Sequence, residues 1–253
     1  MWSLRKLTTK EVALTISFTA LYVVFGFLKI SPIIGLPGQA ITAAAIMAPL
    51  MGVILGPYIS TLSTFLGGLM GFSFGSFSLL SIGSGMTAAL CSGLVCRGKW
   101  VVSVLIYSSL LLFLAFYPVV GVAWLYPASL WFQIVGLIIL VSPLQTVAAR
   151  SFDSNNDSMI LYAFFVVSLS STLAGQIAGS LTLELIHIPN VDYFKGTWQT
   201  ITVLYPIERM IIALAAALIG APLYKVLRHL NMLPLNVSKQ KEISIVEGSQ
   251  TSS

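Results

Sequence analysis

Apolar runs of about 20 residues recur along almost the whole sequence, and this feature restricts the fold more than any other. A run of that length forms a helix of about 30 Å, which matches the hydrocarbon core of a bilayer. Only 8% of the residues are charged and 57% are hydrophobic, whereas a soluble domain carries about 25% charged residues. We therefore expect an all-α, polytopic transmembrane helix bundle, with residues 1–230 forming a single transmembrane domain.

Hydropathy and the positions of glycine and proline predict eight apolar segments. They span residues 11–29, 40–56, 58–72, 78–96, 100–119, 128–149, 158–187 and 204–228. The second and third are the shortest, and Gly56-Pro57 either separates two helices or kinks one. The Gly- and Ser-rich stretch 71–78 is expected to be a loop or a re-entrant turn. Six to eight spans are therefore expected.

The basic residues predict the orientation of these spans. With eight spans and a cytoplasmic N-terminus, ten Lys and Arg residues fall on the cytoplasmic side and two on the outer side. The ten are Arg5, Lys6, Lys10, Arg97, Lys99, Arg150, Lys225, Arg228, Lys239 and Lys241, and the two are Lys29 and Lys195. Because cytoplasmic loops carry the excess of positive charge, both termini are predicted to be cytoplasmic. The polar stretch 231–253 is expected to be a disordered cytoplasmic tail.

The net charge of +5 does not indicate a nucleic-acid partner. The basic residues are scattered between apolar segments and do not form a dense patch with interleaved aromatic residues. Membrane topology explains their positions, so the expected surroundings are a lipid bilayer and no nucleic acid.

Small residues recur at intervals of four along several segments. Since lipid gives no hydrophobic reward for helix association, membrane helices pack closely through such residues. The stripes are Ala40, Ala44, Ala48, Gly52, Gly56, Ser60, Thr64 and Gly68; Gly85, Ala89 and Gly93; Ser171, Gly175 and Gly179; and Ala213, Ala217 and Ala221. We expect internal packing surfaces here, and contact with a partner subunit is the alternative.

Few ionisable residues fall inside the predicted spans. Each costs about 2.5–3.5 kcal/mol on insertion scales, so such residues usually face a cavity or a partner. Glu184 lies near the outer end of one segment, and Glu208 and Arg209 lie near the outer end of the last. On a helix, Gln176, Ser180, Glu184 and His187 share one face. This strip either lines an outer cavity, forms a structural Glu184–Arg209 ion pair, or reaches toward the interface.

Aromatic residues are frequent in the predicted outer loops. They are Tyr117, Trp124, Tyr126, Tyr193 and Trp198. Such side chains could stack on a planar ligand, but an interfacial aromatic belt produces the same pattern.

No catalytic or metal-binding motif is evident. Gly71-Phe-Ser-Phe-Gly75 matches GxSxG, but that motif requires a strand-to-helix turn in an α/β sheet. The sequence contains no GxxxxGK[ST] loop. Cys91 and Cys96 lack metal-ligand spacing, and His187 and His229 are predicted on opposite sides of the membrane. We expect no enzymatic activity, no cofactor and no metal.

Three stretches carry a family resemblance. They are the basic entry and small-residue face of Leu7–Ala20; Pro32-Ile-Ile-Gly-Leu-Pro-Gly-Gln39 with Ala48-Pro-Leu-Met-Gly-Val-Ile-Leu-Gly-Pro57; and Pro206-Ile-Glu-Arg209, at the predicted start of the last helix, with Gly220-Ala-Pro-Leu-Tyr-Lys225. In these stretches the chain resembles the substrate-binding S component of energy-coupling factor (ECF) transporters. The resemblance implies a multi-pass cell-membrane protein that captures a vitamin-like small molecule. It further implies a membrane T component and two cytoplasmic ATPases that supply the energy.

The resemblance also assigns residues. The family docks through an AxxxA motif on its first helix, and Ala13 and Ser17 occupy these positions, with serine in place of the second alanine. The family usually has six helices, so residues 100–149 would be an additional hairpin. By position, the substrate site would include Pro37-Gly38-Gln39 and four residues of the later helices: Gln176, Glu184, Glu208 and Arg209.

Two other functions remain open from the residues alone. A stand-alone secondary transporter would use Glu184 or Glu208 as a proton-linked carboxylate. A membrane enzyme would place Glu208, Arg209 and His187 at its site, but no nucleophile and base are paired in the sequence.

Overall fold

The computed structural model describes residues 8–34, 36–230 and 232–233. Apart from 232–233, the tail expected over 231–253 lies outside the described residues, as do Arg5, Lys6, Lys239 and Lys241.

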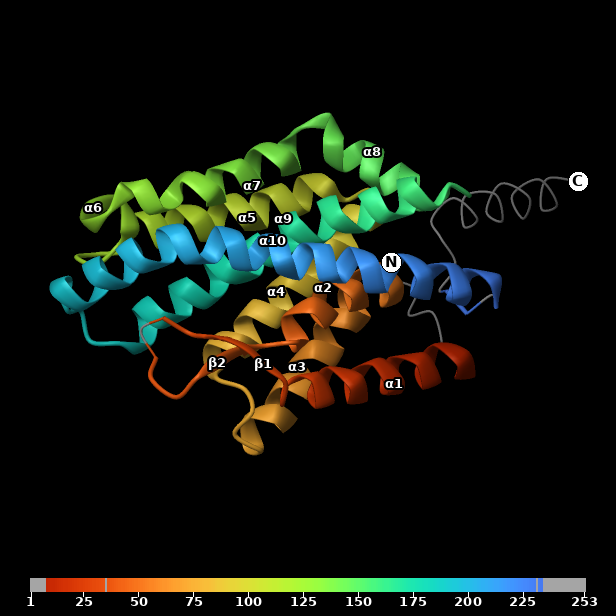
Figure 1. Cartoon of the computed structure of the whole chain (residues 1–253), viewed down its shortest axis with the longest axis horizontal. Coiled ribbons are helices and arrows are strands. Elements are labelled where there is room, and N and C mark those ends of the chain that lie inside the picture. Colours follow the sequence, from red (N-terminus) through yellow and green to blue (C-terminus); the bar gives the residue numbers. More distant parts are fainter. Residues whose placement is uncertain (1–7, 35, 231, 234–253) are drawn as a thin grey trace, which may run out of the picture.

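The described chain is all-α apart from one short antiparallel hairpin (Figure 1). In chain order the elements are α1 (Thr9–Phe25), β1 (Lys29–Pro32), β2 (Ala40–Thr42), α2 (Ala44–Leu55), α3 (Pro57–Ser73), α4 (Leu79–Cys96), α5 (Trp100–Ala115), α6 (Val122–Leu125), the 3-10 turn η1 (Pro127–Leu130), α7 (Trp131–Val141), α8 (Pro143–Ser151), α9 (Asp157–Ile186) and α10 (Val191–His229). The predicted fold class is therefore confirmed at the level of a helical bundle.

The helices run roughly along one long axis, so the bundle has two ends (Figure 1). The β1–β2 hairpin, α6 and the turn between α9 and α10 lie toward one end, at the left in Figure 1, which we call the hairpin end. The start of α1, helix α8 and the end of α10 lie toward the other end, which we call the α8 end.

Local chemistry explains where the helices begin. Thr8 and Glu11 form a reciprocal capping box at the start of α1. Side-chain oxygens of Ser78, Asn156 and Asn190 accept backbone N–H groups at the starts of α4, α9 and α10.

Gly56-Pro57 separates two helices, which resolves the choice left open by the sequence. Gly56 has a φ of 83°, in the left-handed region that favours glycine. Pro57 follows as the first residue of α3, where its missing N–H is not needed. Helix α2 therefore ends at Leu55 and α3 begins at Pro57.

Three predicted segments differ from the structure. The segment at 40–56 becomes helical only at Ala44, because Ala40–Thr42 pairs with β1. The segment at 128–149 is broken into α7 and α8, which are bent by 62°. Ser142 is extended there and caps α8, and Pro143 disfavours a helical residue before it.

The third difference concerns the last helix, which begins at Val191 and not near residue 204. Pro206 therefore lies inside α10 and not at its start. A proline leaves the carbonyl four residues earlier without its helical donor, and that carbonyl belongs to Thr202. The indole Nε1 of Trp131 donates to this oxygen at 3.2 Å, so the helix continues through the proline.

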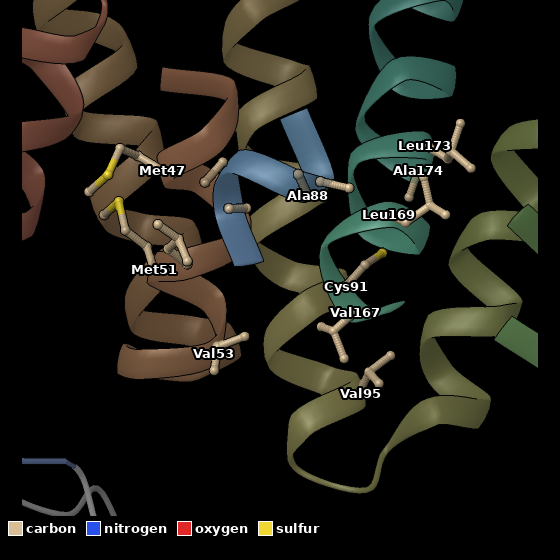
Figure 2. Close-up of a cluster of buried hydrophobic side chains, with 14 of the residues drawn as sticks. Met47, Met51, Val53, Ala88, Cys91, Val95, Val167, Leu169, Leu173 and Ala174 are labelled. Carbon is tan, nitrogen blue, oxygen red and sulfur yellow. The ribbon is translucent and has the colours of Figure 1, made fainter. Parts of the chain in front are cut away.

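The core of the bundle lies where α4 packs between α2 and α9. Met47 and Met51 of α2, Ala88 and Cys91 of α4 and Leu173 of α9 belong to this core (Figure 2). Members of each predicted small-residue stripe are buried: Ala44, Ala48, Gly52, Ser60, Thr64 and Gly68; Gly85, Ala89 and Gly93; Ser171 and Gly175; and Ala213, Ala217 and Ala221. These stripes serve as internal packing surfaces, as expected.

The distribution of polarity is that of a membrane protein. Large apolar side chains are exposed on the outside of the bundle, including Phe113 at 67% and Val203 at 70%. Hydroxyl groups are buried inside it, and Ser60, Ser171 and Thr172 donate to carbonyls four residues earlier in their own helices. Exposed apolar patches of this extent mark contact with lipid or with protein.

Among the described residues, three helices are long and apolar enough to cross a membrane: α4, α9 and α10. The bent pair formed by η1–α7 and α8 would make a fourth. The other predicted spans fall on helices of 12 to 17 residues, namely α1, α2, α3 and α5.

Candidate functional site

A cavity lies between the β1–β2 hairpin and helices α1, α2, α4, α9 and α10. Its volume is about 80 Å³, and since a single water needs about 10–15 Å³, several waters fit. Much of the wall is apolar, and the hairpin contributes Ile33, Ile34 and Ile41. This combination of apolar walls with a few polar groups is typical of a small-molecule site.

Helix α9 brings to the cavity two residues of the predicted polar strip, Gln176 and Ser180, together with Thr172, which was not predicted. Thr172, Gln176 and Ser180 lie one turn apart on one face of the helix, and all three line the cavity. Gln176 is only 4% exposed. Within the described part of the chain, neither its amide nitrogen nor its amide oxygen has a hydrogen-bond partner. Gln176 therefore brings a buried, unsatisfied amide to the wall of the cavity.

Arg209 brings a charged group to the cavity wall, together with a carboxylate that neutralises it. An Nη of Arg209 donates to Oε1 of Glu208 at 2.9 Å, and Ser31 Oγ donates to Oε2 of Glu208 at 2.9 Å. Both members of the ion pair are buried. Arg209 lines the cavity, whereas Glu208 is not among its lining residues. The Nε of Arg209 has no partner among the described residues.

Glu184 is placed differently from all three sequence-based alternatives, since it is buried and reaches neither the cavity, Arg209 nor the surface. It does not line the cavity, and the expected Glu184–Arg209 ion pair is not formed, because Arg209 pairs with its neighbour Glu208. Glu184 is 1% exposed, and both of its oxygens lack a hydrogen-bond partner within the described residues. His187, one turn further on, stacks on Tyr193 with ring centroids 5.6 Å apart.

The structure does not bring Gln39 to the cavity. Its side chain is exposed, and its backbone holds the turn of the hairpin instead. The Ile33 N–H donates to the Gln39 carbonyl at 3.1 Å, and the Gln39 N–H donates to the Leu36 carbonyl at 3.2 Å. None of the loop residues assigned to the site, Pro37-Gly38-Gln39, lines the cavity, whereas Ile33 and Ile34 at the start of the same loop do.

Trp198 is the predicted loop aromatic that reaches the cavity. It lies in α10, is 1% exposed, and its Nε1 donates to the Val120 carbonyl at 3.0 Å. The other four residues of that group do not line the cavity: Tyr117, Trp124, Tyr126 and Tyr193.

Three aromatic residues of the wall were missed by the sequence analysis: Tyr22, Phe77 and Tyr205. The rings of Tyr22 and Phe77 stack with centroids 5.2 Å apart. The spacing does indicate that Tyr22 faces the interior, because Tyr22 follows the buried Leu14 and Phe18 at intervals of four. No periodic pattern indicates the burial of Phe77, since it lies in the turn before α4.

The two residues assigned to docking lie on the exposed face of α1. Ala13 and Ser17 are both exposed, whereas Leu14 and Phe18, adjacent to them in sequence, are buried. Helix α1 therefore buries one face against α2 and α3 and leaves a face with small residues uncovered in the described chain.

No group of three or more His, Cys, Asp or Glu side chains in the described residues is placed to hold a metal ion. Both cysteines are free, with Cys91 buried and Cys96 half-buried. Ser73 of the GxSxG match ends α3, and its hydroxyl donates to the Leu69 carbonyl.

No protein-family model matches this chain, and no similar protein was found among curated proteins or solved structures.

Proposed function

We propose that this chain is the membrane-embedded substrate-capture subunit of an ECF-type importer for a vitamin-like small molecule. The observation that carries the proposal is the cavity beneath the β1–β2 hairpin, with the unpartnered amide of Gln176 and the paired Arg209 in its wall. A binding protein needs such an apolar site with a few fixed polar groups. No other chemistry is required of the chain, because partner proteins would supply the energy.

In this proposal the chain crosses the cell membrane six to eight times, with both termini in the cytoplasm. The hairpin end faces outward, so the cavity is near the outer surface. In support, the basic residues Lys10, Arg150, Lys225 and Arg228 belong to elements at the α8 end, as the positive-inside rule expects for a cytoplasmic end. The bent α7–α8 pair and the short helices would then supply the additional crossings.

The proposed partners are a membrane T component and two cytoplasmic ATPases. The exposed face of α1 suits the docking role, because Ala13 and Ser17 allow close approach of another helix.

Bulky substitutions on this face test the proposal. Ala13→Trp and Ser17→Trp should abolish co-purification of the ATPases from native membranes, because an indole would hold the partner helix away. Ser109→Trp provides the matched control, since Ser109 is an exposed serine on α5. The fraction of each variant that carries a bound small molecule, measured by native mass spectrometry, should remain unchanged. ATPase recovery unaffected by both α1 variants would contradict the docking assignment.

A second function is favoured by one observation, the buried carboxyl group of Glu184 without a partner among the described residues. A stand-alone, proton-coupled secondary transporter would use such a group as its proton carrier. Transport by the purified chain alone in liposomes, driven by a pH gradient and lost in Glu184→Gln, would support this function over the first.

A further inference from the structure

The side-chain amide of Gln176 lacks partners for both its donor and its acceptor within the described residues. Only 4% of Gln176 is exposed, and the residue lines the cavity. A buried polar group without hydrogen bonds is costly, and in native proteins a bound molecule or an ordered water usually satisfies it. The Gln176 amide therefore indicates which hydrogen-bonding groups a molecule in the cavity presents to α9.

A carboxamide places an N–H donor and a C=O acceptor side by side. The group that satisfies both with two parallel hydrogen bonds carries an acceptor beside a donor. A cyclic amide, or lactam, has such an edge, with –NH– next to –C=O. An ammonium or a carboxylate group satisfies only one half of the amide, because the first only donates and the second only accepts.

The charge of the cavity wall points to an uncharged occupant. Arg209 is the one formally charged residue among those lining the cavity in the described chain. Glu208 neutralises it through the 2.9 Å contact, and Ser31 occupies the second oxygen of Glu208. A net charge on the occupant would remain uncompensated among apolar residues, which is unfavourable. The Nε of Arg209 has no hydrogen-bond partner among the described residues, so a second, neutral acceptor on the occupant would satisfy it.

The composition of the wall points to an aromatic ring as the occupant. Tyr22, Phe77, Trp198 and Tyr205 all line the cavity. The indole nitrogen of Trp198 already donates to Val120, so Trp198 offers the occupant its ring. Aromatic side chains pack well against flat rings, in stacked or edge-on arrangements.

We propose that this cavity selects an uncharged, planar heterocycle with a lactam edge, which Gln176 reads through two hydrogen bonds. The Nε of Arg209 donates to a further acceptor on the same ring system. This inference rests on the proposed function, in which the cavity is the substrate site.

The test is equilibrium dialysis of the purified full-length chain with radiolabelled uracil and hypoxanthine as probes. At least one of these lactams should bind saturably at one site per chain. Gln176→Leu keeps the side-chain volume but removes both hydrogen-bonding groups, and should weaken binding by about 100-fold or more. Gln133→Leu is the matched control, because Gln133 is also buried, with an oxygen unpartnered within the described part of the chain, but lies outside the cavity.

Competing ligands show whether the cavity recognises the lactam N–H group and the absence of charge. Excess 6-methoxypurine, which lacks the lactam N–H, should not displace hypoxanthine, and neither should the planar cation benzamidine nor the planar anion benzoate. Glu184→Gln should leave lactam binding unchanged. Failure of both lactams to bind, or unchanged binding in a monodisperse Gln176→Leu protein, would overturn the inference.

The same experiment separates this inference from the proposed function. If benzamidine or benzoate binds and the lactams do not, the cavity remains a capture site and only the ligand class is wrong. If no probe binds and native preparations carry no small molecule, both proposals fail.

Discussion

Ser31 donates a hydrogen bond to Glu208, with 2.9 Å between Oγ and Oε2, and joins β1 to α10 across 177 positions of sequence. The other oxygen of Glu208 accepts from Arg209, which lines the cavity. One buried carboxylate therefore links the position of the hairpin to the orientation of the arginine. The hairpin is held over the cavity by a contact to Glu208, the partner of the wall residue Arg209.

Ser31→Ala should loosen the hairpin without unfolding the helices. A hydrogen bond to a charged group contributes about 1.5–3 kcal/mol, so amide hydrogen exchange over residues 29–42 should accelerate by about tenfold or more. Exchange mass spectrometry in detergent measures this directly. Ser73→Ala, which removes an exposed hydroxyl bonded within α3, should have no effect on that region. Equal exchange in Ser31→Ala and the wild type would show that the contact does not hold the hairpin.

Trp131→Phe should destabilise α10 near Pro206. The substitution leaves the Thr202 carbonyl without its donor, at a cost of about 0.5–1.5 kcal/mol, the net contribution of one hydrogen bond. Unfolding of the detergent-solubilised protein by SDS measures the loss. Trp124→Phe, at an exposed tryptophan of α6, is the control.

A double-mutant cycle tests the cause of this loss. Pro206→Ala restores the helical donor to Thr202, so Trp131→Phe should cost less free energy of unfolding in that background than in the wild type. Equal costs in the two backgrounds would mean that Trp131 stabilises the protein in another way.

Gly175 and Gly179 should respond differently to alanine, although both belong to one GxxxG pattern. A Cβ at Gly175 would lie 2.6 Å from the Ser84 carbonyl oxygen of α4, whereas a Cβ at Gly179 would find its nearest atom at 3.6 Å. Gly175→Ala should therefore lower the melting temperature, with a loss of about 1–3 kcal/mol. Gly179→Ala should be neutral or stabilising, because alanine favours the helix. Equal decreases in melting temperature for the two variants would show that Gly175 is not packed more closely against α4 than Gly179.

Arg228→Lys should weaken the contact between α10 and the turn that joins α8 to α9. The guanidinium of Arg228 donates to three backbone carbonyls at the end of α8 and in the turn after it: Phe152, Asp153 and Ser154. A lysine ammonium cannot reproduce this planar arrangement, so a loss of about 1–3 kcal/mol in stability is expected. Lys225→Arg, at an exposed ion pair with Asp157, should change stability by less than about 1 kcal/mol. Unfolding curves that coincide for both variants would contradict the role of Arg228.

The helical segments were largely predictable because apolar length and glycine-proline breaks have direct physical consequences. The start of α10 was missed because Tyr205-Pro206 resembles a helix start and Asp192 and Lys195 resemble a loop. A helical signal was nevertheless present, since Phe194, Thr197, Trp198 and Ile201 are buried at intervals of three and four. The donor that accommodates Pro206 comes from Trp131, a tertiary contact that no local pattern reveals.

The site was predictable where one helix face determined it. Gln176 and Ser180 share a face of α9, and the structure places both at the cavity with Arg209. The pairing of Arg209 was not predictable, because adjacent helical residues do not normally face each other and Glu208 is fixed by Ser31 from a distant strand. Gln39 was assigned by position in the loop alone, and its backbone, not its side chain, is what the hairpin uses.

Native mass spectrometry of the full-length protein, released gently from its native membrane, tests the central claim most directly. We expect a species heavier than the chain by the mass of one small molecule, and larger assemblies that contain a membrane partner and two ATPase subunits. The small-molecule mass should be lost in Gln176→Leu and retained in Gln133→Leu. A chain that is repeatedly bare, with neither a bound molecule nor partner subunits, would contradict the account and favour the secondary transporter.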